Sequence, residues 1–150
     1  ICDDPNDEDY FFIVGGTKGD MGGIYEEDVP TQPGSQHAFV RKVIVDSLFE
    51  EWTAQHGAWL PNDQETYATM WGCVVKGDTV YAVGVVESGA SMIQGKQMHT
   101  SKGGNDVFVV AYEKETGDIR WMNQVGSTED EELARNGAIA LDASGNVMIF

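Results

Sequence analysis

The sequence predicts an all-β protein made of β-propeller blades: two four-stranded antiparallel repeats preceded by one strand of an earlier blade. Three observations lead to this prediction. The chain repeats itself at an offset of 69 residues, its apolar residues fall in short β-rich runs bounded by turn residues, and no stretch shows helical periodicity. A β-sandwich is the alternative architecture, but sandwiches do not usually show a repeat of this length.

The repeat appears when the chain is aligned with itself. Trp121 matches Trp52, and Gly84 matches Gly15 at the same offset. Five further pairs follow: Asp9 and Asp78, Val14 and Val83, Phe39 and Phe108, Gln55 and Gln124, Gly57 and Gly126. Seven matches at one offset, mostly at glycine, tryptophan and apolar positions, indicate a repeat. The expected units are 1–15 (the end of an earlier blade), 16–83 and 84–150.

The strands follow in chain order. Residues 10–16 are rich in aromatic and β-branched side chains and form the expected strand of the earlier blade. The first repeat then supplies four expected strands at 38–45, 49–55, 70–75 and 79–86. The second supplies four at 106–113, 119–125, 137–142 and 146–150. Turn sequences separate them, notably 76–78, 114–118 and 143–145.

One of these turns explains the tryptophans. Thr116 and Gly117 form the turn between two strands, with Gly117 free to adopt a positive φ, and Trp121 follows it. We interpret Trp121, and Trp52 at the equivalent position, as packing residues that fill the gap between neighbouring blades. The first repeat departs from the pattern, because 46–50 (DSLFE) replaces the Thr-Gly turn and Lys42 stands where Ala111 does.

These residues resemble a known repeat. Ala111, Thr116, Gly117 and Trp121 match the pattern A-x-D-x-x-T-G-x-x-x-W of the quinoprotein-like propellers, with Glu113 in place of the aspartate. Residues 142–150 (DASGNVMIF) look like the D-x-x-G-N-x-Y-x-x-G end of the seven-bladed SBBP repeats. The resemblance implies either a non-catalytic scaffold or a dehydrogenase that uses pyrroloquinoline quinone and calcium. The vicinal cysteines of one group of those enzymes are absent here, which favours the scaffold.

Composition and charge exclude several classes of partner. The net charge of −16 repels phosphate backbones and anionic lipids, so nucleic-acid binding is not expected. No apolar run is long enough for a membrane span, so membrane insertion is not expected. Acidity and the resemblance together favour an extracellular or cell-envelope location. Cys2 and Cys73 make neither a disulfide framework nor a zinc site; Cys73 is interpreted as a small buried hydrophobe, and a disulfide between the two stays open.

An acidic stretch near the N-terminus is the candidate metal site. Asp4, Asn6, Asp7 and Asp9 offer the hard oxygen ligands that calcium prefers, although their spacing is not that of an EF-hand loop. The alternative is an acidic loop that precedes a strand. His37, His56 and His99 share no metal-binding or catalytic motif.

The lengths of the connections predict where binding happens. Successive connections of an antiparallel blade alternate between its two ends. The short connections at 46–48, 76–78, 114–118 and 143–145 should share one end, and the long ones at 16–36, 56–69, 87–105 and 126–136 the other. The long connections carry the candidate binding residues Asp63, Glu129, Asp130, Glu131 and Glu132.

Three functions remain open from the sequence. The favoured one is a non-catalytic scaffold that binds protein or glycan partners. The others are a quinoprotein-like oxidoreductase fragment and a calcium-stabilised structural module. Two repeats leave blade edges unpaired, so we expect further blades from a longer chain or from other chains.

Overall fold

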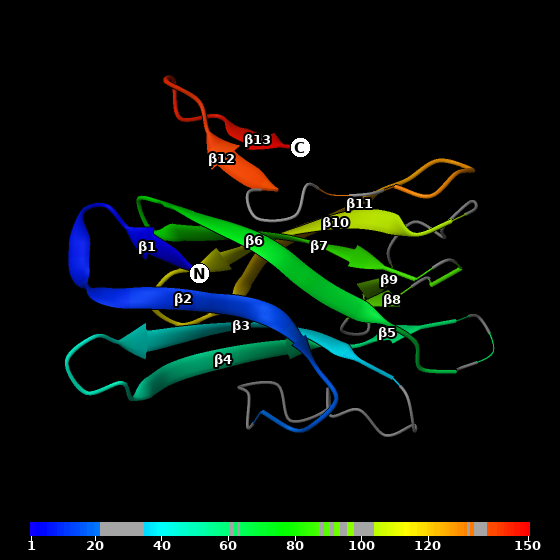
Figure 1. Ribbon diagram of the computed structural model, residues 1–150, viewed down its shortest axis with the longest axis horizontal. Coiled ribbons are helices and arrows are strands. Elements are labelled where there is room, and N and C mark those ends of the chain that lie inside the picture. The colour runs from blue at the N-terminus through cyan, green and yellow to red at the C-terminus, as the bar shows by residue number, and fades with distance from the viewer. Residues whose placement is uncertain are drawn as a thin grey trace.

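The computed structural model describes residues 1–21, 35–60, 62, 64–87, 89–90, 92–93, 96–97, 104–131, 133 and 138–150. Over these residues the protein consists of β-strands, turns and irregular segments, which confirms the all-β fold class (Figure 1). Neighbouring strands within each described sheet are antiparallel.

Two four-stranded sheets form the body of the molecule, and each follows the order of the chain. The first sheet contains β1 (Cys2–Asp4), β2 (Asp7–Thr17), β3 (His37–Ile44) and β4 (Glu50–His56). The second contains β6 (Ala68–Lys76), β7 (Thr79–Val86), β10 (Asp106–Glu113) and β11 (Ile119–Val125). A hairpin of β12 (Ile139–Leu141) and β13 (Val147–Ile149) follows, and β5 (Ala58–Trp59), β8 (Met92–Ile93) and β9 (Lys96–Gln97) form a small sheet of their own.

The sheets are out of phase with the expected four-strand units. The grouping of the strands at 38–86 into one blade is wrong, because β3 and β4 pair with β2 while β6 and β7 pair with β10. The segment after His56 leaves the first sheet and enters the second at Ala68. The sequence repeat holds nevertheless, since β2, β3 and β4 lie 69 residues before β7, β10 and β11. What the repeat could not reveal is where one sheet ends and the next begins.

Gly15 and Gly84 have equivalent places in the two sheets. Gly15 pairs with Phe39 across β2 and β3, and Gly84 pairs with Phe108 across β7 and β10. The phenyl ring lies over the glycine in both pairs: a Cβ atom would come within 3.1 Å of the ring at Gly15 and within 2.7 Å at Gly84. Each glycine therefore makes room for an aromatic ring on the neighbouring strand.

The sheets stack on one another and bury two apolar layers. Phe12, Val40 and Trp52 of the first sheet pack against Phe108 and Tyr112 of the second sheet in the larger core. The opposite face of the second sheet forms a smaller core with the segment that leads into β12, to which Val83, Val109, Leu133, Ala138 and Ile139 contribute. Alternate residues of β7 and β10 therefore face different layers, as the two-residue period of a strand requires.

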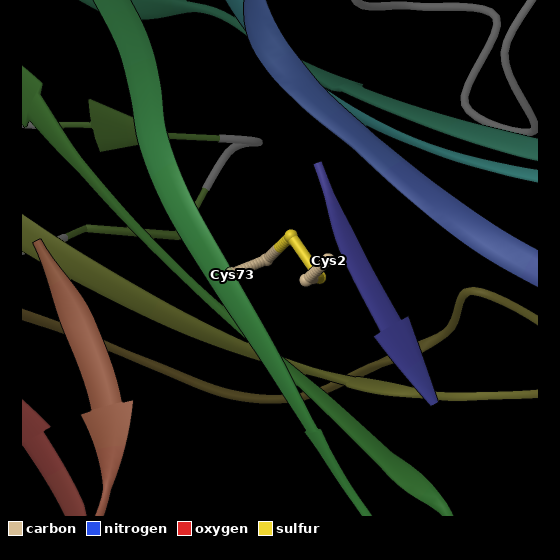
Figure 2. Close-up of a disulfide and its surroundings, with 2 residues drawn as sticks. All are labelled: Cys2 and Cys73. Carbon is tan, nitrogen blue, oxygen red and sulfur yellow. A yellow bond between two sulfur atoms is a disulfide. The ribbon is translucent and has the colours of Figure 1, made fainter. Parts of the chain in front are cut away.

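A disulfide joins the two sheets at their edge strands. Cys2 on β1 and Cys73 on β6 are bonded to each other, with their Cα atoms 5.6 Å apart (Figure 2). The disulfide that the sequence left open is therefore present, and the Cys73 side chain also lies in the larger core, as expected of a small buried residue. The two residues are 71 positions apart in sequence and meet only because β6 packs beside β1.

Candidate functional site

The connections between strands separate into two ends. The short-turn end consists of the turns at 5–6, 45–49, 77–78, 114–118 and 142–146, and these lie together on one side of the molecule (Figure 1). The long-connection end consists of the connections at 18–36, 57–67, 87–105 and 126–138, whose described parts lie on the opposite side. This confirms the expected separation of short and long connections.

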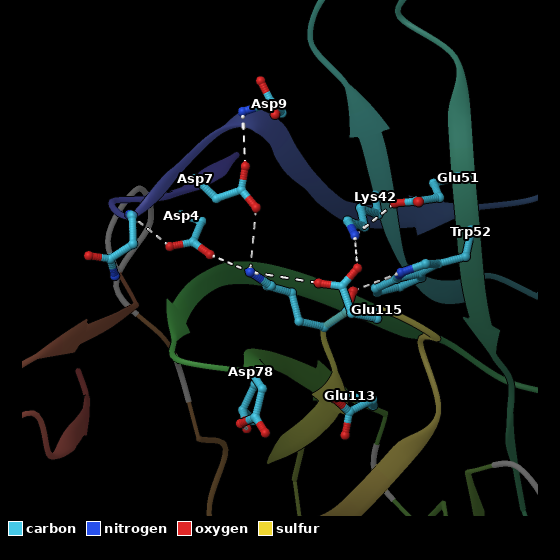
Figure 3. A network of polar contacts seen from close by, with 12 residues as sticks. Asp4, Asp7, Asp9, Lys42, Glu51, Trp52, Asp78, Glu113 and Glu115 are labelled. Atoms are coloured by element: carbon cyan, nitrogen blue, oxygen red, sulfur yellow. Dashed lines mark hydrogen bonds and ion pairs between the residues drawn. The ribbon is translucent and has the colours of Figure 1, made fainter.

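Two lysines connect the sheets at the short-turn end. Lys114, in the turn after β10, places its Nζ atom 2.9 Å from Asp4 and 3.7 Å from Asp7 in the first sheet (Figure 3). Lys42, on β3, contacts Glu51 at 2.7 Å and Glu115 of the second sheet at 2.9 Å. Its ammonium group also lies 3.9 Å from the centre of the Tyr10 ring, within cation–π distance. Each sheet thus supplies one lysine to carboxylates of the other.

Three members of these ion pairs, Asp4, Lys42 and Lys114, have shifted pKa values. Burial opposes the charged form of Asp4, but the hydrogen bond and charge of Lys114 together with hydrogen bonds from Asn6 outweigh it, so the pKa of Asp4 lies below its ordinary value. The hydrogen bond with Asp4 raises the pKa of Lys114. Lys42 is completely buried, yet hydrogen bonds with Glu51 and Glu115 raise its pKa despite that burial. Asp4, Lys42 and Lys114 are therefore charged at neutral pH.

The predicted calcium ligands surround the ammonium group of Lys114 or cap local turns. Asp4 and Asp7 face Lys114, and Asp4 also accepts a hydrogen bond from the main-chain N–H of Asn6. Asp7 accepts one from the N–H of Asp9. Over the described part of the chain, no three His, Cys, Asp or Glu side chains are grouped so that they could hold a metal ion. The ammonium group of Lys114 supplies the positive charge beside Asp4 and Asp7.

Trp52 and Trp121 hold equivalent places in their sheets but differ in exposure. Trp52 on β4 lies in the larger core, with 4% of its surface exposed, and its indole N–H donates to the main-chain oxygen of Lys114 at 3.0 Å. Trp121 on β11 is 45% exposed and packs against Tyr81. Trp52 is therefore buried between the sheets, as a packing residue should be, whereas Trp121 remains about half-exposed to solvent.

The Thr-Gly turn has the predicted conformation. Gly117 adopts a φ of 76°, and its N–H donates to the carbonyl of Glu113. The Thr116 hydroxyl donates to the carboxylate of Asp118 at 2.8 Å, which closes the turn. Leu48 occupies the equivalent position in the first sheet and also has a positive φ, 56°, although a leucine is strained there.

The candidate binding residues at the long-connection end are partly engaged in structure. The carboxylate of Asp130 accepts a hydrogen bond from the N–H of Asn105 at 2.8 Å, and that of Glu131 accepts one from Ser127 at 3.0 Å. Glu129 is exposed, and its main-chain N–H donates to Ser127. Asp63 and Glu132 lie outside the described residues. Asp130 and Glu131 thus stabilise the conformation of their own loop in addition to contributing negative charge.

A buried polar cluster near this end could not be predicted from sequence motifs. His56 on β4 contacts the hydroxyl of Tyr112 on β10 at 2.6 Å, and the two rings stack. Burial, followed by the proximity of His37, lowers the pKa of His56 to about 3, so its ring is neutral at physiological pH. His37 lies 3.9 Å from Glu65, which accepts a hydrogen bond from Ser35. This cluster ties the 57–67 connection to both sheets; His99 lies outside the described residues.

Comparison with known proteins adds no relative: neither a protein-family model nor a curated protein matches the chain. The described residues also include no helix with the length and apolar character needed to cross a membrane. Of the titratable groups at the two ends, Lys42, Lys114, Asp4 and His56 all contribute to contacts between the sheets.

Proposed function

We propose that the chain is part of a β-propeller of the quinoprotein-like type and acts as a non-catalytic scaffold that binds protein or glycan partners. One observation carries this proposal: ion pairs and an indole hydrogen bond hold the short-turn end together, while the long connections gather at the opposite end. A rigid body with variable loops at one end is the arrangement that binding scaffolds commonly use.

The stacking of the sheets supports the propeller part of the proposal. Two four-stranded antiparallel sheets and a further hairpin follow one another, each packed face to face on the last. Consecutive blades of a propeller pack in this way. The Cys2–Cys73 disulfide supports a location outside the cytoplasm, because structural disulfides persist mainly in oxidising compartments.

The long-connection end is the proposed binding surface, and its acidic residues favour basic partners. A decalysine peptide serves as the probe, with affinity measured by calorimetric titration at low and at physiological salt. The test variant carries Glu129→Gln, Asp130→Asn and Glu131→Gln. Amide oxygens can still accept the hydrogen bonds that Asp130 and Glu131 make, so the loop should keep its shape while losing three charges.

A matched control removes three exposed carboxylates from the short-turn half of the first sheet: Asp3→Asn, Glu8→Gln and Asp46→Asn. We expect the test variant to bind decalysine about tenfold more weakly at low salt, with a smaller loss in the control. Melting temperatures should change little in either. Equal weakening in both variants would mean that only net charge matters, and the proposed binding surface would be wrong.

A further inference from the structure

The two tryptophans belong to matching aromatic pairs. Within the first sheet, the ring centres of Phe12 and Trp52 are 5.9 Å apart and the rings are inclined by 48°. Within the second sheet, the ring centres of Tyr81 and Trp121 are 6.0 Å apart and the rings are inclined by 52°. The residues of the second pair follow those of the first by the repeat offset. The second sheet therefore presents, on its far face, an aromatic pair equivalent to the one with which the first sheet binds it.

The first of these surfaces is covered by a hairpin. Trp52 contacts Tyr112 at 6.2 Å between ring centres and donates to the carbonyl of Lys114, while His56 binds the Tyr112 hydroxyl. Tyr112 and Lys114 both belong to the hairpin of β10 and β11. That single element thus supplies the stacking ring, the hydrogen-bond acceptor and the partner of His56.

The second surface is open at the corresponding positions. Trp121 and Val125, the equivalents of Trp52 and His56, are 45% and 58% exposed. The hairpin of β12 and β13 packs beside β6, and among the described strands β13 pairs only with β12. It therefore occupies the place that β6 and β7 take in the second sheet, and its outer edge at β13 offers unpaired main-chain groups.

We propose that the face formed by Tyr81, Trp121 and Val125 binds an antiparallel β-hairpin of a polypeptide partner, which pairs with the free edge of β13. The inference depends on the stacked-sheet scaffold proposed above and identifies where the next sheet is completed. Continuity with the existing interface carries it, because the contacts of Trp52 and His56 with Tyr112 and Lys114 across that interface are made to one hairpin.

The contacts of the first interface also define the chemistry of that partner. Its turn presents a main-chain carbonyl to the Trp121 indole, and an aromatic side chain near the turn stacks on the same ring. Lys76 stands at the repeat position of Asp7, so the sign of the charge is reversed at this interface. Its ammonium group is held at the short-turn end by a hydrogen bond to the carbonyl of Gly145. The turn of the partner would therefore carry a carboxylate that pairs with Lys76, in the place where Lys114 provides an ammonium group at the first interface.

A second copy of the chain is the alternative occupant. Its β3–β4 turn is the repeat equivalent of the β10–β11 turn and exposes the apolar side chains of Val45, Leu48 and Phe49. The strands β1 and β2 of that copy would, however, compete with β12 and β13 for the same place. The proposal therefore commits to a hairpin, and dimerisation is an outcome that the test must separate.

The test supplies such a hairpin to the full chain. The protein is extended after Phe150 by a flexible linker as long as the 87–105 connection, followed by a copy of residues 106–125. In this copy the tryptophan is replaced by phenylalanine, and glutamate stands in place of Lys114. Tethering keeps the local concentration of the hairpin near the millimolar range. The measurement is hydrogen exchange of the indole N–H groups in protein labelled with ¹⁵N-tryptophan, assigned with the variants Trp121→Phe and Trp52→Phe.

We expect exchange of the Trp121 indole N–H to slow at least about tenfold, while that of Trp52 stays unchanged. A matched extension carries Tyr112→Ser and Val110→Ser in the copy and should give no protection. Equal exchange in the two extended proteins would overturn the proposal. So would protection that increases with concentration in the unextended chain and accompanies a dimer in ultracentrifugation. Decalysine binding is measured on the same proteins, so its failure beside a protected Trp121 would count against the binding surface alone.

Discussion

At the scale of single residues, the two repeat glycines allow a direct comparison. A Cβ atom at Gly84 would lie 2.1 Å from the main-chain oxygen of Thr69 and 2.7 Å from the Phe108 ring. At Gly15 the nearest atom is 3.1 Å away, in the Phe39 ring. Side chains can shift more easily than the main chain. We therefore expect Gly84→Ala to reduce the free energy of unfolding by about 1–3 kcal/mol and Gly15→Ala to reduce it less.

Urea denaturation of the two variants beside the parent protein measures both effects. A change in the transition midpoint at constant slope would show that only stability is altered. If Gly15→Ala proved the more damaging substitution, the cross-strand register of β6 and β7 near Gly84 would be in doubt.

At the scale of strands and turns, the Lys114–Asp4 pair determines how firmly the first two sheets hold together. The side chain of Asp4 is 3% exposed, so Lys114→Met would leave a buried carboxylate without its ammonium partner. We expect this substitution to reduce the free energy of unfolding by about 2 kcal/mol at neutral pH. Lys18→Met, which removes an exposed charge at the other end of the sheet, is the control and should have little effect.

Acid should narrow the difference between Lys114→Met and the parent protein. The folded-state pKa of Asp4 lies below its ordinary value, so the pair stabilises the fold at neutral pH and this contribution is lost as the pH falls below the ordinary aspartate range. Urea titrations at neutral pH and in that acid range test the sign. A difference that stays constant with pH would show that Lys114 acts through packing and not through its charge.

Strands and turns were the part of the fold that could be read from the sequence. β-Branched and aromatic runs predicted the main strands, and Thr116 and Gly117 predicted their turn, because both signals are local. The grouping of strands into sheets was mispredicted, since a repeat fixes the period and not the boundary. Lys114 and Asp4 are 110 residues apart, and His56 and Tyr112 are 56 apart, so no spacing rule connects them. Those contacts arise only when one sheet packs on the next.

At the scale of the whole molecule, the short-turn end and the long-connection end differ in structure. Contacts between sheets concentrate charge pairs at the short-turn end, and the long connections lie opposite. The sequence predicted this separation because alternation is a property of antiparallel strands. It could not predict that Asp130 and Glu131 would also stabilise their own loop, since those bonds depend on how the loop closes against Asn105.

The disulfide also determines how the molecule would carry mechanical load. Tension applied between the N- and C-termini passes from Cys2 directly to Cys73 through the disulfide. The intervening residues, which include nearly all of the first sheet, bear none of it. With 71 positions bypassed, the oxidised chain should extend about 250 Å less than the reduced chain when pulled until it is fully unfolded. Single-molecule force spectroscopy with and without reductant measures this difference, and equal extensions would contradict it. Only the second sheet and the hairpin after it would then yield under force, while the first sheet stays folded as a shielded unit.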